Sequence, residues 1–352
     1  MMSTPRAAAP DIARGLALGL IALANATWWS SGHDSTTWWD RAAELVRAGA
    51  LEQRVYPLFV MLMGYGITQF LAGQREGTRR AIMIRSVLLV ALGLAHGVLL
   101  WQGDVLAAYG LLAILAVWWA VPRSSRTLWL FLALAGGSSL VVALTVAMVP
   151  VSPGDGLPTD WVLLTSTDGL IALQARVVYW LLNSALSPFM PTIVLPLVLG
   201  IVAARYRVLE EPERYLRTLR LVSLAVPVGW TLGVFDELAG LQQLWLMDTL
   251  AGMVTALGYA AMIALLSRHA QLPALQALGR SSLSGYLAQS AVLVPVLAPW
   301  ALGASAQLGP AAVMGVGVLT WMITLIWAHA RSTTTRGRHR GPFEKMLRRA
   351  MW

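Results

Sequence analysis

Long apolar stretches recur along almost the whole chain and are separated by polar connections. About ten of them approach the roughly 20 residues that an α-helix needs to cross a bilayer. Of the 352 residues, 57% are hydrophobic and 12% are charged, whereas about a quarter of a soluble domain is charged. We therefore expect an all-α fold, a polytopic bundle of about ten transmembrane helices. The expected spans are Leu16–Trp29, Val55–Ala72, Ala81–Trp101, Val105–Val121, Thr127–Val149, Val177–Ala204, Leu221–Phe235, Leu241–Leu266, Ser281–Trp300 and Ala311–His329.

The Lys and Arg residues gather in alternate connections, which is the pattern that sets the topology of membrane proteins. If the N-terminus is cytoplasmic, nearly all of the 26 Lys and Arg residues fall on the cytoplasmic side. The exceptions are Arg41, Arg47, Arg54 and Arg176. We therefore predict that both termini are cytoplasmic and that Ser30–Arg54 and Pro150–Asp168 are external. This topology explains the net charge of +9, so no nucleic-acid partner is expected.

The pattern indicates one membrane-embedded domain over residues 1–352. Residues 1–126 hold the N-terminal helices, residues 127–275 the middle helices, and residues 276–352 the C-terminal helices and a basic tail. The connection before the second span is expected to include a short interfacial helix. Three prolines within the expected span Val177–Ala204 predict a kink or a break there. No internal repeat is detectable.

The first apolar run has the general pattern of a secretory signal peptide, with Ala24-Asn25-Ala26 at the position of a cleavage site. The acidic Asp11 near its start and the continuation of the run into a tryptophan pair favour a retained first span. Arg14 and Asn25 are eleven residues apart, about three helical turns, so they share one helix face. We expect that face to point into the bundle.

Ionisable side chains interrupt the apolar runs between Arg85 and Tyr109. Such groups are costly in hydrocarbon, so they indicate a functional site. Arg85 and His96 share one helix face and are separated by about 16 Å along the helix. Gly103 permits a tight turn that would bring Asp104 to the imidazole of His96. The alternative is that Arg85 anchors a helix end and His96 is a packed, structural histidine.

Other polar residues lie in or beside the expected spans. Ser282, Tyr286 and Gln289 are spaced i, i+4 and i+7, which places them on one helix face. The residues expected to contact a substrate or to hold helices together are Asp11, Asn25, Arg54, Tyr109, Asp248, Tyr286 and Gln289. The chain has no cysteine, and its five histidines lack metal-ligand spacing, so no metal site is expected.

Several motifs together resemble the YeiB-like family of bacterial inner-membrane proteins. The N-terminal motifs are Asp11-Ile-Ala-Arg14-Gly15, Tyr56-Pro-Leu-Phe59, Gly64-Tyr65-Gly66, and His96 followed by Trp101-Gln-Gly103-Asp104 and Tyr109. The C-terminal motifs are Leu278-Gly279-Arg280-Ser-Ser-Leu-Ser-Gly-Tyr286-Leu-Ala-Gln289-Ser290 and Gly341-Pro342-Phe-Glu344 with Arg348. The resemblance implies a multi-pass protein of the bacterial inner membrane, in contact with membrane lipids.

The opening Asp…Arg-Gly motif is also similar to that of transmembrane acyltransferases. This similarity implies that a cytoplasmic acyl-CoA donates an acyl group to a small-molecule or glycan hydroxyl at the outer face. His96 would then be the general base, and Asp104 would orient it or hold the acceptor. Arg14, Arg85 and Arg280 would bind the phosphates of the donor at the inner surface.

Two other classes of protein remain open. In a transporter or permease, the same residues would relay protons or hold a substrate, and the broken sixth span would line a cavity. In a structural membrane protein, the polar residues would only hold helices together. A tunnel from an arginine-lined mouth to His96 would favour acyl transfer, whereas two pseudo-symmetric halves would favour transport.

Overall fold

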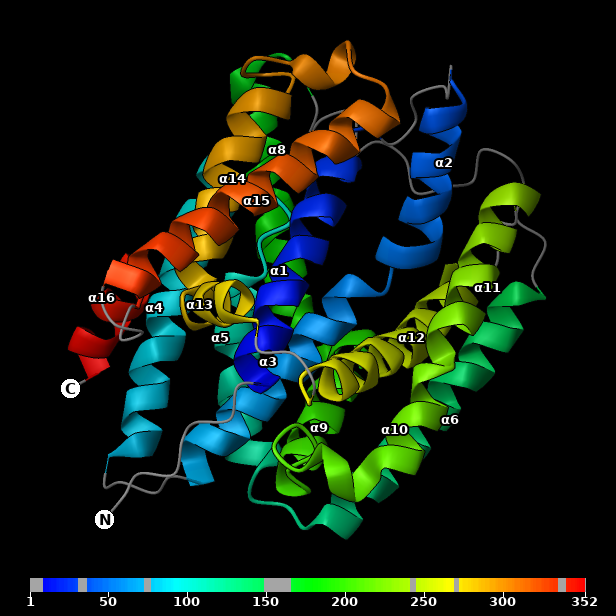
Figure 1. Cartoon of the computed structure of the whole chain (residues 1–352), viewed down its shortest axis with the longest axis vertical. Helices are drawn as coiled ribbons and strands as arrows, with labels where there is room; N and C mark the ends of the chain where they lie inside the picture. Colours follow the sequence, from blue (N-terminus) through cyan, green and yellow to red (C-terminus); the bar gives the residue numbers. More distant parts are fainter. Residues whose placement is uncertain are drawn as a thin grey trace.

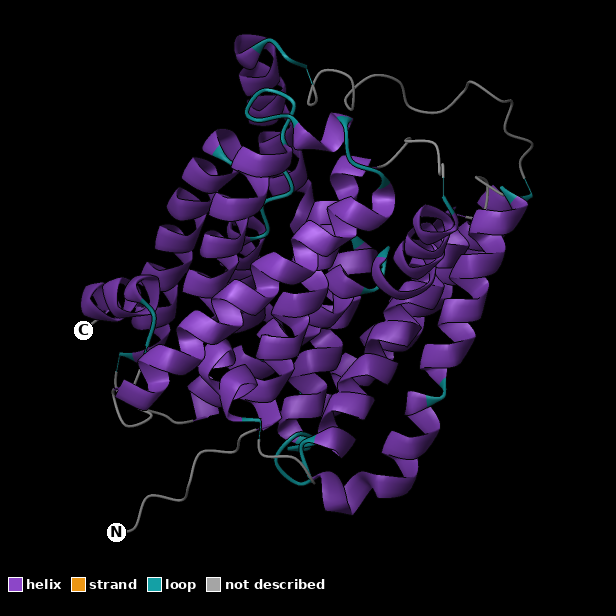
Figure 2. Ribbon diagram, turned by 45° about the horizontal axis from the view of Figure 1, so that its top comes forward, coloured by secondary structure: helices purple, strands orange, loops and turns teal. Residues whose placement is uncertain are grey.

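The structure, a computed structural model, is a bundle of helices in the residues that it describes (Figure 1). These residues are 9–30, 37–72, 77–148, 166–240, 245–268, 272–334 and 340–351. Helices far apart in the sequence lie side by side, and the second view shows helices and loops but no strand in these residues (Figure 2). The predicted all-α class is therefore confirmed.

The helices are named in the order of the chain. Those of the first part are α1 (Ala9–Thr27), α2 (Trp38–Val46), α3 (Val55–Ala72), α4 (Thr78–Leu99), α5 (Leu106–Leu115) and α6 (Ser125–Ala147). Those of the second part are α8 (Gly169–Leu186), α9 (Pro191–Arg205), α10 (Leu216–Ser223), α11 (Ala225–Ala239), α12 (Trp245–Leu266), α13 (Pro273–Arg280), α14 (Ser282–Leu297), α15 (Pro310–Thr334) and α16 (Pro342–Met351).

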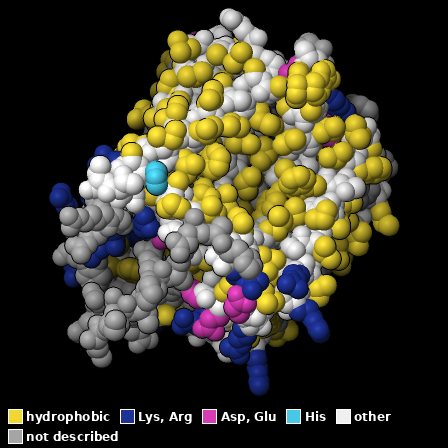
Figure 3. Space-filling view, viewed as in Figure 1, with side chains coloured by type: hydrophobic (Ala, Val, Ile, Leu, Met, Phe, Trp, Pro, Cys, Tyr) yellow, Lys and Arg dark blue, Asp and Glu magenta, His cyan; other side chains and the backbone are white. Residues whose placement is uncertain are grey.

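Eight helical segments of the described chain are long and apolar enough to cross a membrane. They are Ala9–Ser30, Trp38–Ala72, Thr78–Leu99, Ser125–Thr145, Gly169–Phe189, Pro212–Ala239, Met247–Leu266 and Pro310–Thr334. Three shorter apolar segments are Leu106–Ala120, Pro191–Arg205 and Ser282–Leu297. Figure 3 shows a broad hydrophobic surface, with most Lys and Arg side chains of this face gathered along its lower and left edges. The chain is therefore a multi-pass membrane protein, while the exact number of spans and the cytoplasmic placement of the termini stay predictions.

The bounds of the N-terminal spans follow the hydrophobic pattern closely. The second predicted span and α3 have the same bounds, Val55–Ala72. Helix α1 begins earlier than predicted, at Ala9 rather than Leu16. Pro10 suits the first turn, and the negative charge of Asp11 is favourable at a helix N-terminus. As a result Arg14 lies within the helix instead of preceding it.

The predicted sixth span, Val177–Ala204, is wrong as a single helix, although the predicted break is confirmed. Helix α8 ends at Leu186, a 3-10 turn covers Ser187–Phe189, and α9 begins at Pro191. Proline lacks an N–H and suits the first turn of a helix, whereas in the interior it removes a backbone hydrogen bond and favours a kink or a break. The chain therefore starts a new helix at this point.

Helix α8 begins at Gly169, before the predicted start of the sixth span at Val177. The carboxylate of Asp168 accepts hydrogen bonds from the backbone amides of Leu170 (2.8 Å) and Ile171 (3.3 Å). This is the N-cap interaction that satisfies the first amides of a helix. Most of the predicted external loop Pro150–Asp168 lies outside the described residues, so that part of the topology stays a prediction.

The predicted short helix in the first long connection is present as α2. The Thr37 hydroxyl accepts from the Asp40 amide (3.2 Å), and the Thr37 amide donates to the Asp40 carboxylate (3.1 Å). This reciprocal capping box fixes the start of the helix. His33 and Asp34, which belong to the same predicted connection, lie outside the described residues.

Helices α3 and α9 pack closely along their length. Gly64 of α3 lies against the carbonyl of Leu197, and Gly200 of α9 lies against the carbonyl of Met61. A side chain at either glycine would overlap the backbone of the partner helix. The close approach of the two helices therefore depends on glycine at both positions.

This crossing gives a first prediction. Gly200→Ala should lower the free energy of unfolding by about 1–3 kcal/mol, because the added methyl group forces α3 and α9 apart. The matched control is Gly137→Ala in α6, where no neighbouring atom lies within 4 Å of the added group. That control should be neutral or stabilising by up to about 1 kcal/mol. Thermal unfolding in one detergent measures both, and equal melting temperatures would contradict the close crossing.

Candidate functional site

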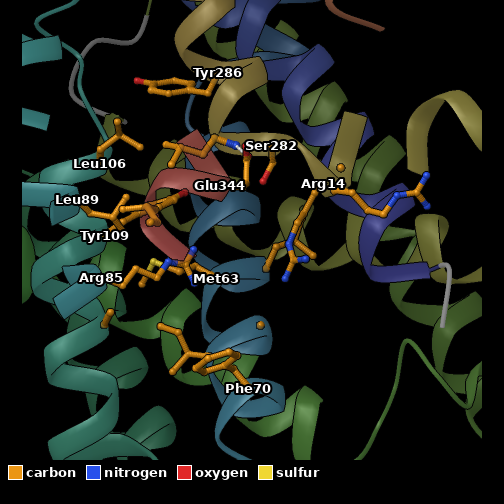
Figure 4. Close-up of a pocket in the computed structure, with 18 of the residues that line it drawn as sticks. Arg14, Met63, Phe70, Arg85, Leu89, Leu106, Tyr109, Ser282, Tyr286 and Glu344 are labelled. Atoms are coloured by element: carbon orange, nitrogen blue, oxygen red, sulfur yellow. Dashed lines mark hydrogen bonds between the residues drawn. The ribbon is translucent and has the colours of Figure 1, made fainter. Parts of the chain in front are cut away.

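A cavity of about 840 Å³ lies among α1, α3, α4, α5, α13, α14 and α16. We call it the arginine cavity, because five arginines line it. They are Arg14, Arg85, Arg280, Arg340 and Arg348. Its apolar lining includes Phe59, Leu62, Met63, Ile67, Phe70, Ile82 and Leu89. Figure 4 shows Arg14 and Arg85 reaching toward the same space from different helices, with Tyr286 at the upper end of the view.

Arg14 enters the arginine cavity from the first turns of α1. Its Nη1 lies 3.5 Å from the Asp11 carboxylate, one helical turn earlier. Its guanidinium also lies against Gly66 of α3, where any side chain would overlap it. The ion pair and the glycine together direct the Arg14 side chain across the cavity toward α3.

The other two predicted arginines line the same cavity. Arg85 is exposed to it and forms no hydrogen bond or ion pair within the described residues. Arg280 donates one hydrogen bond from Nη2 to the hydroxyl of Ser332 (3.1 Å), and its buried Nε has no partner in that part of the chain. The two guanidinium groups therefore keep donors that protein atoms do not satisfy. The predicted role in phosphate binding stays a prediction.

The tail helix α16 forms one wall of the arginine cavity through a contact with α14. The Glu344 carboxylate accepts from the backbone amides of Leu283 (2.7 Å) and Ser284 (3.1 Å) and from the Ser284 hydroxyl (2.5 Å). Negative charge at a helix N-terminus is favourable, so Glu344 both caps α14 and holds α16 in place. This clamp places Arg348 at the cavity.

Sequence reasoning missed Arg340 and Arg348 as cavity residues, because the basic tail was interpreted as a marker of topology. The available signal was the motif at residues 341–344, in which an acidic residue stands between these arginines. Its partner lies about 60 residues earlier in the chain. The sequence alone gave no reason to join the two segments.

His96 and Asp104 are in direct contact at the far end of the α4–α5 hairpin. The His96 Nδ1 lies 2.9 Å from the Asp104 Oδ1, and both side chains are buried. The second carboxylate oxygen of Asp104 accepts from the amide of Ala107 (3.0 Å), at the start of α5. The predicted approach of the carboxylate to the imidazole is therefore confirmed, and its role in catalysis stays a prediction.

The arginine cavity does not reach His96, so the tunnel expected for acyl transfer is not continuous in this structure. His96 is 2% exposed and is absent from the cavity lining. Tyr286, which lines the cavity, lies against the imidazole with ring centroids 5.0 Å apart. The His96 Nε2 is buried and has no hydrogen-bond partner within the described chain.

A second, smaller pocket of about 200 Å³ lies at the opposite end of α1 and α3. We call it the small pocket. Its residues are Ile21, Ala24, Asn25, Leu51, Glu52, Gln53, Val55, Tyr56, Phe59, Gly103, Val105, Tyr109 and Tyr286. It shares Phe59, Val105, Tyr109 and Tyr286 with the arginine cavity. Arg14 lines the arginine cavity and Asn25 lines the small pocket. These are the two residues that were predicted to share one face of the first span.

The remaining predicted polar residues lie away from the arginine cavity. The buried Arg54 donates to the Asp248 carboxylate at 2.6 Å and 3.2 Å and to the Gly229 carbonyl at 3.0 Å. It therefore ties the start of α3 to α11 and α12. Gln289 donates to the Thr324 hydroxyl (3.2 Å), which joins α14 to α15. Both contacts have the geometry of interhelical links.

Metal ligands are not grouped in the part of the chain that the structure describes. No cluster of three or more His, Asp or Glu side chains there is arranged to hold a metal ion.

Apolar helices that enclose ionisable side chains define a multi-pass integral membrane protein.

Residues 203–352 match the family described as "Protein of unknown function (DUF418)". The chain is 41% identical over 68 residues to "Uncharacterized protein YeiB" of Escherichia coli (strain K12), covering 19% of this chain and 16% of that protein. It is 21% identical over 349 residues to "Uncharacterized protein YxaH" of Bacillus subtilis (strain 168), covering 89% of this chain and 83% of that protein. No solved structure matches. The family match and both relatives support the similarity to the YeiB-like family that the motifs predicted.

The Arg54–Asp248 pair gives a prediction about stability. Asp248→Ala should lower the free energy of unfolding by about 3–5 kcal/mol, because it leaves a buried guanidinium without its carboxylate. The matched control is Glu213→Ala, which removes the exposed partner of Arg268. That change should cost about 1 kcal/mol or less. Thermal unfolding of both variants is the measurement, and a stability loss of similar size in each would show that Arg54 does not depend on Asp248.

Proposed function

We propose that this protein is a transmembrane O-acyltransferase that moves an acyl group from a cytoplasmic acyl-CoA to a hydroxyl group of an envelope or glycan acceptor. The observation that carries the proposal is the arginine cavity. It combines five guanidinium groups with an apolar lining and ends beside Tyr286, the ring in contact with His96. An anionic head followed by an apolar chain suits such a space.

The donor is recognised by charge and by shape. Arginine is always protonated and presents a planar fork of donors that matches phosphate oxygens. Arg85 has no polar protein partner in the described residues, and Arg340 and Arg348 stand at the exposed side of the cavity. The apolar residues behind them would receive the pantetheine arm and the acyl chain. The thioester would then lie toward Tyr109 and Tyr286.

The His96–Asp104 pair supports the chemical step. An ionised Asp104 accepts the hydrogen of Nδ1, which leaves the lone pair of the neutral imidazole on Nε2. The Nε2 atom takes the proton of the acceptor hydroxyl while the hydroxyl oxygen attacks the thioester carbonyl. The new C–O bond replaces the C–S bond, and the departing thiolate receives the proton from the imidazolium. No covalent enzyme intermediate is needed.

This step requires a movement of Tyr286. Its ring lies against His96 and lines both the arginine cavity and the small pocket. A rotation of this side chain would open Nε2 to the substrates.

A transporter is the second candidate, and one observation favours it. The arginine cavity and the small pocket lie at opposite ends of the same helices and share four lining residues. A thin barrier between two facing cavities is also what an alternating-access protein needs. Purified protein in liposomes separates the two candidates. The proposed enzyme would transfer acyl groups without moving a substrate across the membrane. A transporter would move a substrate across the membrane without transferring acyl groups.

The donor site gives a direct prediction. Arg85→Ala and Arg280→Ala should each weaken the binding of acetyl-CoA about 10- to 100-fold, because each removes a charge-assisted contact of about 1.5–3 kcal/mol. Replacement by Lys should restore only part of the affinity, since the fork geometry is lost. The control is Arg126→Ala, which removes an exposed arginine outside the cavity. Binding to purified protein is the measurement, and unchanged affinity in both cavity variants would contradict the proposed donor site.

The catalytic pair gives a second prediction. His96→Gln and His96→Ala should both lower the rate of acyl transfer about 10²–10⁴-fold with little change in donor affinity, because each removes the base. Asp104→Asn should lower the rate of acyl transfer by a smaller factor, since the imidazole remains. A structural histidine predicts a different order, in which Gln keeps activity and Ala lowers the melting temperature. Transfer rates and thermal unfolding of the three variants decide between these outcomes.

A further inference from the structure

The small pocket and the arginine cavity are reached from opposite ends of the same helices. On α1, Arg14 lines the arginine cavity and Asn25 lines the small pocket, about 16 Å further along the helix axis. On α3, Gly66 and Phe70 line the arginine cavity, whereas Tyr56 lines the small pocket. The two spaces therefore meet in the interior, beside the His96–Asp104 pair.

The lining of the small pocket is aromatic with a few neutral polar groups. Tyr56, Phe59, Tyr109 and Tyr286 supply four rings, and the rings of Phe59 and Tyr109 are stacked with centroids 5.3 Å apart. Binding sites of this composition take ligands by apolar contact and use the polar groups to fix orientation. The pocket lacks the arginines that characterise the larger cavity.

The polar groups of the small pocket are suited to hydroxyl groups. Asn25 and Gln53 each offer an amide that both donates and accepts hydrogen bonds. The hydroxyl of Tyr109 is buried and has no hydrogen-bond partner in the described residues. The carboxylate of Glu52 is paired with Arg47. The pocket therefore presents neutral hydrogen-bonding groups and no unpaired charge of its own.

The backbone at the rim of the small pocket is held in an unusual conformation. Gln53 has a φ of 56°, in the left-handed region that a residue with a side chain rarely adopts. Gly252 lies against its carbonyl, and its neighbour Arg54 is buried and paired with Asp248. These contacts fix the strained residue, and strain that the surroundings enforce is typical of ligand sites.

We propose that the small pocket is the acceptor site and that it binds a neutral sugar ring. The faces of a pyranose ring are apolar and match the aromatic side chains, while its edge carries hydroxyl groups for the two amides and Tyr109. One of these hydroxyl groups would point toward the interior, where the two spaces share Tyr286. The inference rests on the proposed acyl transfer, because it names the class of acceptor.

The test uses the absence of cysteine from the native chain. Asn25→Cys places one thiol in the small pocket of the full-length protein and leaves the aromatic rings, Gln53 and Tyr109 to bind the sugar, so the Kd below is that of the variant. Trp38→Cys places one thiol on the exposed part of α2. Each variant in liposomes is treated with a membrane-impermeant maleimide, with and without methyl β-D-glucoside. The sugar should slow labelling of Asn25→Cys about tenfold at ten times its Kd and leave Trp38→Cys unchanged.

Three outcomes would overturn the inference. Labelling of Asn25→Cys that is unaffected by the sugar would mean that the pocket does not bind it. Failure of the thiol to react at all would mean that the pocket is closed to solvent. Equal slowing by glycerol would mean that hydroxyl groups alone, without a ring, account for binding.

A third variant separates this inference from the proposed function. Gln69→Cys places the thiol at the arginine cavity. Acetyl-CoA should slow its labelling, and methyl β-D-glucoside should not. Protection of Gln69→Cys by acetyl-CoA without protection of Asn25→Cys by the sugar would keep the donor site and remove the sugar site. The reverse pattern would remove the donor site and keep the sugar site.

Discussion

The close crossing of α1 over α13 is the contact on which the arrangement of the arginine cavity depends. Gly15 and Gly279 each lie against the backbone of the other helix, where a side chain would overlap it. Arg14 precedes the first glycine and Arg280 follows the second. Because small residues let the two backbones touch, both arginines emerge beside one space instead of at separate helix ends. The two motifs therefore act as one structural unit, although about 265 residues separate them in the chain.

The last helix completes this space in a way that preserves its positive charge. The Glu344 carboxylate is engaged by two backbone amides and a hydroxyl at the start of α14. These three hydrogen bonds hold the carboxylate at the helix terminus. The tail thus supplies Arg340 and Arg348 to the lining while its own acidic residue is held at the helix terminus. The five arginines outnumber Asp11 and Glu344, the two acidic residues of the lining, so the cavity carries a net positive charge.

Local contacts could be predicted from the sequence, and distant ones could not. The contact between His96 and Asp104 spans eight residues around one turn, so helix length and a glycine were enough to predict it. The shared face of Arg14 and Asn25 follows from helix periodicity alone. The clamp on α14 and the Arg54–Asp248 pair join segments 60 and 194 residues apart, and no periodicity relates them. The end of the cavity at Tyr286 depends on how three helices pack, which the hydrophobic pattern does not specify.

The environment of His96 argues for a second conformation of the site. A buried polar atom without a hydrogen-bond partner is expensive away from water, so a ring nitrogen gains free energy when a partner reaches it. Here Nδ1 is held by Asp104, whereas the buried Nε2 has no partner in the described residues. The ring of Tyr286, which also lines both cavities, lies against the imidazole. In the proposed reaction, movement of that ring would let the acceptor hydroxyl reach Nε2, which would then gain a hydrogen-bond partner.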